Sequence, residues 1–172
     1  MTKHALFVIA PADFRDEELF EPQKVLQDAG VEITIASREP GEVIGKLGGK
    51  AKAQIGINQV NAEDFDAVIF VGGPGAATYF ADPAAHLLAQ KAVKSGKILA
   101  AICIAPTVLA NAGVLKGKKA TVFPSPDGEK ALADGGASYT KANVEVDGKI
   151  ITANGPEAAT EFGEKILELL GE

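Results

Sequence analysis

The sequence of 172 residues predicts a doubly wound α/β fold, with a mostly parallel sheet, helices on both faces and added β-hairpins. Short apolar runs without polar alternation recur along the chain, as expected for parallel strands that are buried on both faces. Stretches with helical periodicity lie between them and end at glycine. The expected strands are 5–10, 31–37, 66–71, 98–102 and 118–123, and the expected helices are 16–29, 83–95, 105–112, 125–135 and one starting at 155–156.

Two further segments predict hairpins. Residues 43–57 contain Gly48-Gly49 and favour a small antiparallel excursion at the sheet edge. Residues 143–153 contain Asp147-Gly148 and give the clearest hairpin signal in the chain. We found no internal repeat and no linker, so the length indicates one domain over residues 1–172.

Composition restricts the class of protein. Hydrophobic residues make up 47% and charged residues 23%, which is ordinary for a globular protein. The net charge is −6 and no basic cluster occurs, so nucleic acid is not expected as a partner. A single cysteine excludes an internal disulfide and a cysteine-rich metal site, and we expect no cofactor. The absence of a long apolar run or secretory segment predicts a cytoplasmic protein that does not bind membranes.

The only cysteine lies where a buried strand should turn into a helix. The apolar run 98–102 ends at Cys103, and Pro106 suits the first turn of the next helix. Open α/β sheets bind ligands at this carboxyl end of their strands. The N–H groups of the helix start should make the thiol ionise more easily than a free one. The alternative is that Cys103 is a small hydrophobic core residue.

Glu18 is a second candidate. It falls on the apolar stripe of the helix expected over 16–29, where a carboxylate needs an explanation. The alternative is that the helix starts later, as Pro22 would allow, and that Glu18 is a solvated residue of the first turn.

A glycine turn, Gly72-Gly73-Pro74-Gly75, follows the strand expected over 66–71. It matches neither a Walker motif nor a dinucleotide fingerprint, so a nucleotide site is weakly supported. Its glycines favour backbone N–H groups that approach a reacting atom, as in an oxyanion hole, or simply a tight turn.

Five segments carry a family resemblance: 14–22, 66–73, 100–103, 117–122 and 155–156 with the helix that follows. Taken together and in this order, they resemble the ThiJ/PfpI superfamily over nearly the whole chain. The resemblance implies a flavodoxin-like fold and a homodimer or larger assembly. It also implies that Cys103 is the nucleophile, and that Glu18 is a protonated acid that hydrogen-bonds the sulfur. By the same resemblance, Gly73 and the N–H of Ile104 line an oxyanion pocket.

Two positions depart from the family pattern. Ile104 stands where the protease-like branch has histidine, and Phe123 stands where the deglycase branch often has one. His4 and His86, the only histidines, match no family site. A cysteine peptidase is therefore the weakest hypothesis, because no base follows the nucleophile.

The function that this resemblance implies is an enzyme that acts on 2-oxoaldehydes or their adducts, so its partner would be a small reactive carbonyl compound. The first alternative is a redox sensor in which an oxidant modifies Cys103. The second is a degenerate site on a fold retained for stability or binding.

Overall fold

The computed structural model describes all 172 residues and contains a central sheet of seven strands. The strand order is β10-β11-β7-β6-β1-β2-β5, and every pair is parallel except β10 with β11. This confirms the predicted flavodoxin-like fold and its hairpin at residues 143–153. The strands are β1 His4–Val8, β2 Glu32–Ser37, β5 Ile55–Gly56, β6 Ala67–Phe70, β7 Ile98–Ile102, β10 Val144–Asp147 and β11 Ile150–Ala153.

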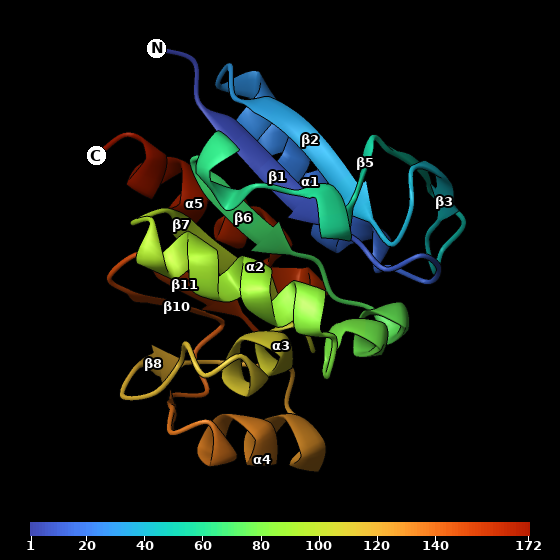
Figure 1. Cartoon of the computed structure of the whole chain (residues 1–172). Helices are drawn as coiled ribbons and strands as arrows, with labels where there is room; N and C mark the ends of the chain where they lie inside the picture. The colour runs from blue at the N-terminus through green and yellow to red at the C-terminus, as the bar shows by residue number, and fades with distance from the viewer.

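Helices cover both faces of the sheet (Figure 1). Helices α2 and α3, with α4 beyond them, lie on one face, and α1 and α5 lie on the other. Side chains alternate along β1, so that Leu6 and Val8 enter one apolar cluster and Phe7 and Ile9 the other. No helix combines the length and the apolar composition needed to cross a bilayer. The helices are α1 Asp16–Asp28, α2 Pro83–Lys94, α3 Pro106–Asn111, α4 Pro126–Asp134 and α5 Ala159–Leu170.

Short elements complete the chain. The expected excursion forms an antiparallel hairpin of β3 (Gly41–Ile44) and β4 (Lys50–Ala53), whereas β5 joins the central sheet parallel to β2. The four 3₁₀ helices are η1 Ile57–Gln59, η2 Ala62–Asp64, η3 Pro74–Tyr79 and η4 Pro156–Ala158.

The expected strand 118–123 is wrong in extent and place. Only β8 (Lys119–Ala120) forms, and it pairs with β9 (Ser138–Tyr139) in a separate two-stranded sheet. The next amides leave the ladder, because the N–H of Thr121 donates to Thr152 Oγ1 at 2.9 Å and that of Phe123 donates to the carbonyl of Cys103 at 2.8 Å. Residues 121–123 therefore hydrogen-bond to β11 and to the end of β7 instead of extending the sheet.

His86 lies in α2. Its ring is half-buried, and its Nε2 lies 2.8 Å from the carbonyl oxygen of Phe80. This contact ties α2 to the end of η3.

Candidate active site

Cys103 occupies a strained turn directly after β7. Its φ is 65°, in the left-handed region that side chains rarely adopt. Two hydrogen bonds hold the turn: the N–H of Cys103 donates to the carbonyl of Ala153 at 2.9 Å, and its carbonyl accepts from Phe123. The predicted strand-to-helix position of Cys103 is confirmed, and the turn lifts the sulfur to the carboxyl end of the sheet.

Glu18 meets Cys103 from the first turn of α1. The helix starts at Asp16 and contains Pro22, so the alternative of a late start is wrong. The Glu18 side chain is 0% exposed, and neither carboxyl oxygen has a hydrogen-bond partner by distance and angle. A Cβ placed on Gly72 would lie 2.5 Å from both Glu18 Oε1 and Cys103 Cβ. Gly72 is thus the spacer that lets the two side chains approach each other.

Burial controls the charge of Glu18. Loss of solvent raises its pKa to about 8, against the opposing effect of the Arg15 charge. Glu18 is therefore mostly protonated at neutral pH. Buried carboxyl groups without a partner are uncommon outside functional sites, which favours a chemical role for this one.

The thiol does not ionise as easily as the sequence suggested. Burial and the negative charge of Glu18 raise the pKa of Cys103 to about 12. The N–H groups of Gly73 and Ile104 oppose this increase. When Glu18 is protonated its charge is absent, so the proton on Glu18 favours the thiolate beside it. The expectation that the thiol ionises more easily than a free one is wrong, because burial raises its pKa whether or not Glu18 is ionised.

Gly73 and Ile104 bring two backbone donors to the sulfur. Both N–H groups lower the pKa of Cys103, and neither donates to a backbone carbonyl. Gly73 has a φ of 100°, and a Cβ there would lie 2.3 Å from the backbone nitrogen of Arg15. Only glycine fits this turn, and the four residues expected at the site therefore lie together.

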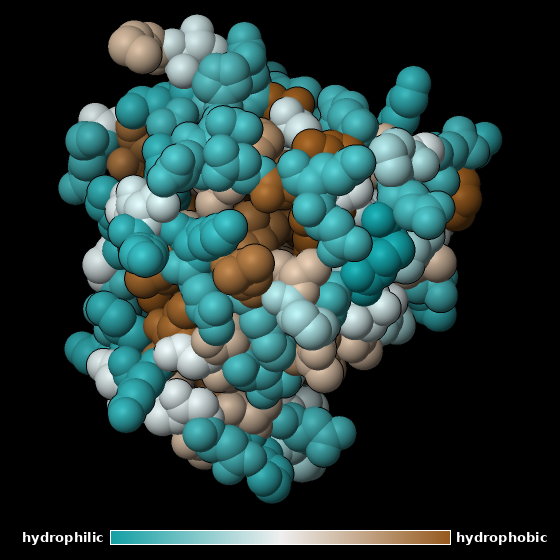
Figure 2. Space-filling model, viewed as in Figure 1, coloured by the Kyte–Doolittle hydropathy of each residue, from teal (hydrophilic) through white to brown (hydrophobic).

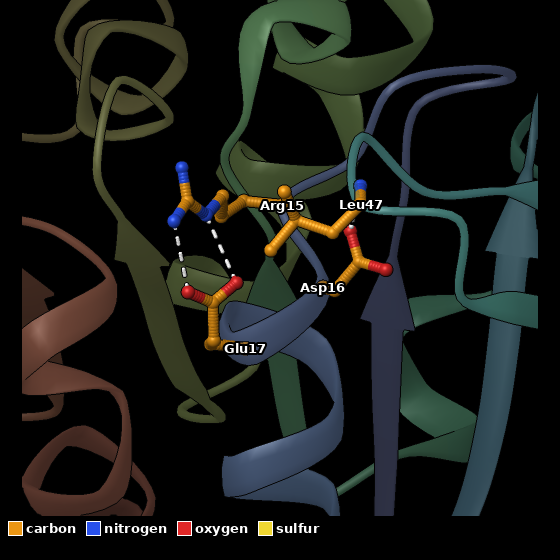
Figure 3. A network of polar contacts seen from close by, with 4 residues as sticks. All are labelled: Arg15, Asp16, Glu17 and Leu47. Carbon is orange, nitrogen blue, oxygen red and sulfur yellow. Dashed lines mark hydrogen bonds and ion pairs between the residues drawn. The ribbon is translucent and has the colours of Figure 1, made fainter.

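Arg15 is a cation beside the site that the sequence analysis missed. Its Nε and Nη2 donate to the two carboxylate oxygens of Glu17, each at 2.9 Å (Figure 3). Its charge lowers the pKa of Glu18 and is also felt by Cys103. The feature of the sequence that could have indicated Arg15 is its position directly before three successive acidic residues.

Those acidic residues serve three different contacts. Asp16 accepts a hydrogen bond from the N–H of Leu47 at 2.8 Å (Figure 3). It accepts a second from the N–H of Gly49 at 2.7 Å, and the two bonds fix the β3–β4 turn on the start of α1. Glu17 holds Arg15, and Glu18 reaches Cys103. The divergence follows from helix geometry, because successive side chains point about 100° apart.

Two hollows are lined in part by residues of the segment 123–128, and Cys103 is in the wall of neither. The larger has a volume of about 450 Å³ and the smaller about 300 Å³. Phe123, at the position where the deglycase branch often carries histidine, is 41% exposed and lines the smaller one. The larger is lined by Phe80, Ile104, Thr107, Ser125, Asp127 and Gly128.

Neither histidine serves the cysteine. His4 begins β1 at the amino end of the parallel sheet, opposite to Cys103, and His86 contacts the carbonyl of Phe80. No group of three or more His, Cys, Asp and Glu side chains is arranged to hold a metal ion.

A doubly wound sheet with a cysteine at a left-handed elbow, against a buried carboxyl group, defines a class of α/β proteins built around one thiol. The chain belongs to the DJ-1/PfpI family, whose model matches residues 3–169.

Individual relatives support this assignment. The chain is 43% identical to the uncharacterized protein MJ0967 of Methanocaldococcus jannaschii over 166 residues, which are 96% of this chain and 81% of the relative. It is 33% identical to Deglycase PH1704 of Pyrococcus horikoshii, covering 92% and 94%. It is 30% identical to the glutathione-independent glyoxalase DJR-1.2 of Caenorhabditis elegans, covering 98% and 89%.

Among solved structures, the ThiJ/PfpI domain protein from Brachyspira murdochii superimposes with a TM-score of 0.95 at 34% identity. The match covers 99% of this chain and 97% of that one. The similarity therefore extends through the whole sheet and its helices.

Proposed function

We propose that this protein is a cysteine-dependent enzyme that converts 2-oxoaldehydes such as methylglyoxal, or their adducts, with Cys103 as nucleophile and Glu18 as acid and base. The observation that carries the proposal is the buried Glu18 carboxyl group, without a geometric hydrogen-bond partner, against the only thiol. The names of the relatives, a deglycase and a glyoxalase, support the same chemistry.

The first step forms a carbon–sulfur bond. In the fraction of molecules in which Glu18 is ionised, Cys103 Sγ attacks the aldehyde carbon while the thiol proton passes to the Glu18 carboxylate. The carbonyl electron pair moves to oxygen, which the N–H groups of Gly73 and Ile104 stabilise. Glu18 then returns the proton to this oxygen, and the product is a hemithioacetal.

The second step is an isomerisation that needs no external oxidant. The Glu18 carboxylate removes the proton from the former aldehyde carbon, and an enediol forms with the neighbouring ketone carbon. Protonation of that second carbon and loss of the hydroxyl proton give an α-hydroxy thioester, so one carbon is oxidised and the other reduced. Water then adds to the thioester, which releases the hydroxy acid and the thiol of Cys103.

Two variants test this scheme. Cys103→Ser and Glu18→Gln should each abolish lactate formation from methylglyoxal, measured enzymatically. Circular dichroism and thermal melting report whether the variants fold. A folded variant of either kind with full activity would overturn the mechanism.

We propose redox sensing as a second candidate, because the donors around the sulfur also suit a sulfinate. Two equivalents of peroxide would convert the Cys103 thiolate to a sulfinate and two waters. Gly73, Ile104 and protonated Glu18 would hold the two new oxygens. Peroxide followed by intact mass should then show two added oxygens, and their absence would refute this role.

A peptidase is disfavoured, because the half-buried side chain of Ile104 cannot act as a base.

We further propose that the protein acts in the cytoplasm as a homodimer or larger assembly. Phe20, Ile44 and Leu47 are 36%, 43% and 62% exposed, and the β3–β4 turn brings this apolar surface beside α1. Light scattering after size exclusion tests the assembly, and a monomer at micromolar concentration would contradict it.

A further inference from the structure

A basic hollow lies at the amino end of the parallel sheet, opposite to Cys103. Its volume is about 610 Å³, and it is bordered by η2, by the last turn of α2 and by the segment that leads into β7. The five residues of β7 run from this hollow toward the elbow, so about 17 Å of strand separates the two. The hollow is therefore distinct from the candidate active site. It is lined by Asn61, Glu63, Lys91, Lys94, Ser95 and Lys97.

Three lysines give the wall of this hollow its charge. Lys91 and Lys94 are three residues apart in α2 and are therefore neighbours on the helix surface, and Lys97 follows the end of the helix. Glu63 is the only acidic residue in the wall, so the formal charge of the lining is +2 in a chain whose net charge is −6. No run of basic residues marks this cluster in the sequence, because the helix end brings together lysines that are separated by other residues.

The charged residues of the hollow have no ionic partner within the chain. The six ion pairs of the protein involve neither the three lysines nor Glu63. Like charges at neighbouring positions on a helix repel each other. A bound anion would offset this repulsion, whereas a neutral or cationic ligand would not.

The end of α2 does not need these lysines as caps. The N–H of Gly96 donates to the carbonyl of Val93 at 3.1 Å, and the N–H of Lys97 donates to the carbonyl of Ala92 at 2.9 Å. Gly96 has a φ of 72°, so the helix ends in a left-handed glycine turn that satisfies its last carbonyl groups with backbone amides. The ammonium groups therefore remain available to a ligand.

The rest of the wall is hydrophilic. Asn61 caps η2, since its Oδ1 accepts the N–H of Glu63 at 3.2 Å, and its Nδ2 carries two further donor hydrogens. Ser95 adds a hydroxyl group, and no hydrophobic residue lines the hollow. A nucleobase or an acyl chain would find no apolar surface to pack against. Figure 2 shows that hydrophilic side chains predominate on the face that α2 covers, with apolar surface in the middle of the view.

We propose that this hollow binds a small hydrophilic anion with two or more phosphate groups, an inorganic polyphosphate or a sugar bisphosphate, through Lys91, Lys94 and Lys97. Lysine ammonium groups bind phosphate as point charges, and three of them suit a ligand that carries several negative charges. The carboxylate of Glu63 repels such a ligand and limits its affinity. The proposal does not depend on the reaction proposed for Cys103.

Isothermal titration calorimetry tests the site with two probes, inorganic tripolyphosphate and fructose 1,6-bisphosphate, in buffer of low ionic strength without divalent cations. At least one probe should bind with a submillimolar Kd, and added KCl should weaken the binding because exposed charges are screened. The probe that binds more tightly distinguishes an inorganic polyphosphate from a sugar bisphosphate. Absence of binding of both probes at millimolar concentration would overturn the proposal.

Variants assign the binding to the hollow. The double substitution Lys91→Gln/Lys94→Gln should weaken binding about tenfold, because one exposed charge contact contributes about threefold. The matched control Lys50→Gln/Lys52→Gln removes the same charge from two exposed positions of β4 outside the hollow, and should change the affinity less than about twofold. Glu63→Gln should strengthen binding about threefold, because it removes the only negative charge of the wall.

An equal loss of affinity in the two double variants would show that the probes respond to the overall charge, and would overturn the site. Wild-type affinity in Lys91→Gln/Lys94→Gln would overturn it as well. Circular dichroism reports whether each variant folds. Because the hollow lies at the other end of the sheet from Cys103, these variants should keep any conversion of methylglyoxal by the wild-type protein, so the two proposals can fail independently.

Discussion

Replacing Glu18 by Gln should change how the stability of the protein depends on pH. The folded-state pKa of Glu18 is about 8, compared with an ordinary value of 4.5. Between these two values the folded protein keeps the proton and the unfolded chain has released it. Folding therefore takes up a proton in this window, and stability must decrease as pH rises. Below pH 4.5 both states hold the proton, and Glu18 causes no slope.

The magnitude follows from the width of the window. Each pH unit between 4.5 and about 8 costs about 1.4 kcal/mol, which adds up to about 5 kcal/mol when the window is crossed. Because Glu18 is fully buried, solvent screening does not reduce this amount much. Glu18→Gln keeps the shape but cannot ionise, so the variant should lack this part of the pH dependence.

The assay is urea unfolding of both proteins from pH 4.5 to 8.5. The difference in unfolding free energy between Glu18→Gln and wild type should grow in favour of the variant as pH rises, and level off above about pH 8. All other titrating groups are shared and cancel in the difference. Parallel curves across this range would show that Glu18 ionises normally and would refute the assignment of a protonated buried acid.

Three further predictions concern the neighbours of Glu18. Asp16→Ala removes the acceptor of two backbone N–H groups in the β3–β4 turn, and should lower the unfolding free energy in urea by about 2–3 kcal/mol; an unchanged midpoint would contradict this. Gly73→Ala should abolish activity and destabilise the fold, because a Cβ would lie 2.3 Å from a backbone nitrogen at a φ of 100°; a fully active variant would show that the turn is not tight. Arg15→Gln removes a positive charge that favours both the Cys103 thiolate and the Glu18 carboxylate, so the pH profile of Cys103 alkylation by iodoacetamide should move to higher pH. An unchanged pH profile would show that the Arg15 charge does not affect the ionisation of Cys103 and Glu18.

The sheet and the elbow were predictable because each depends on local pattern. The apolar run 98–102 shows no alternation, and such runs form parallel strands buried on both faces. Pro106 marks the helix start that places Cys103 between the two elements. Glu18 was predictable for a similar reason, since helical periodicity places it on a buried stripe.

The errors came from contacts between distant segments. Residues 118–123 have the composition of a strand, yet the amides of Thr121 and Phe123 bond to Thr152 and Cys103 rather than to a ladder. The pKa of the thiol was misjudged because a helix start is visible in the sequence and a buried acid against the sulfur is not. The hollow of about 450 Å³ is lined by residues from η3, α3 and α4 and the segments next to them. No pattern in the sequence links residues that lie in such separate segments.

The residues of the candidate site depart from the usual rules of backbone conformation and of side-chain burial. Cys103 has a positive φ that costs of order 1–3 kcal/mol, and Glu18 is a buried acid without a geometric partner. Gly72 leaves no room for a side chain between them. Each feature is unfavourable for folding alone, and a protein selected only for stability would replace Glu18 by an apolar residue of similar volume. Their meeting at one sulfur, beside two N–H groups that donate to no backbone carbonyl, supports the proposed proton transfer between the thiol and the acid.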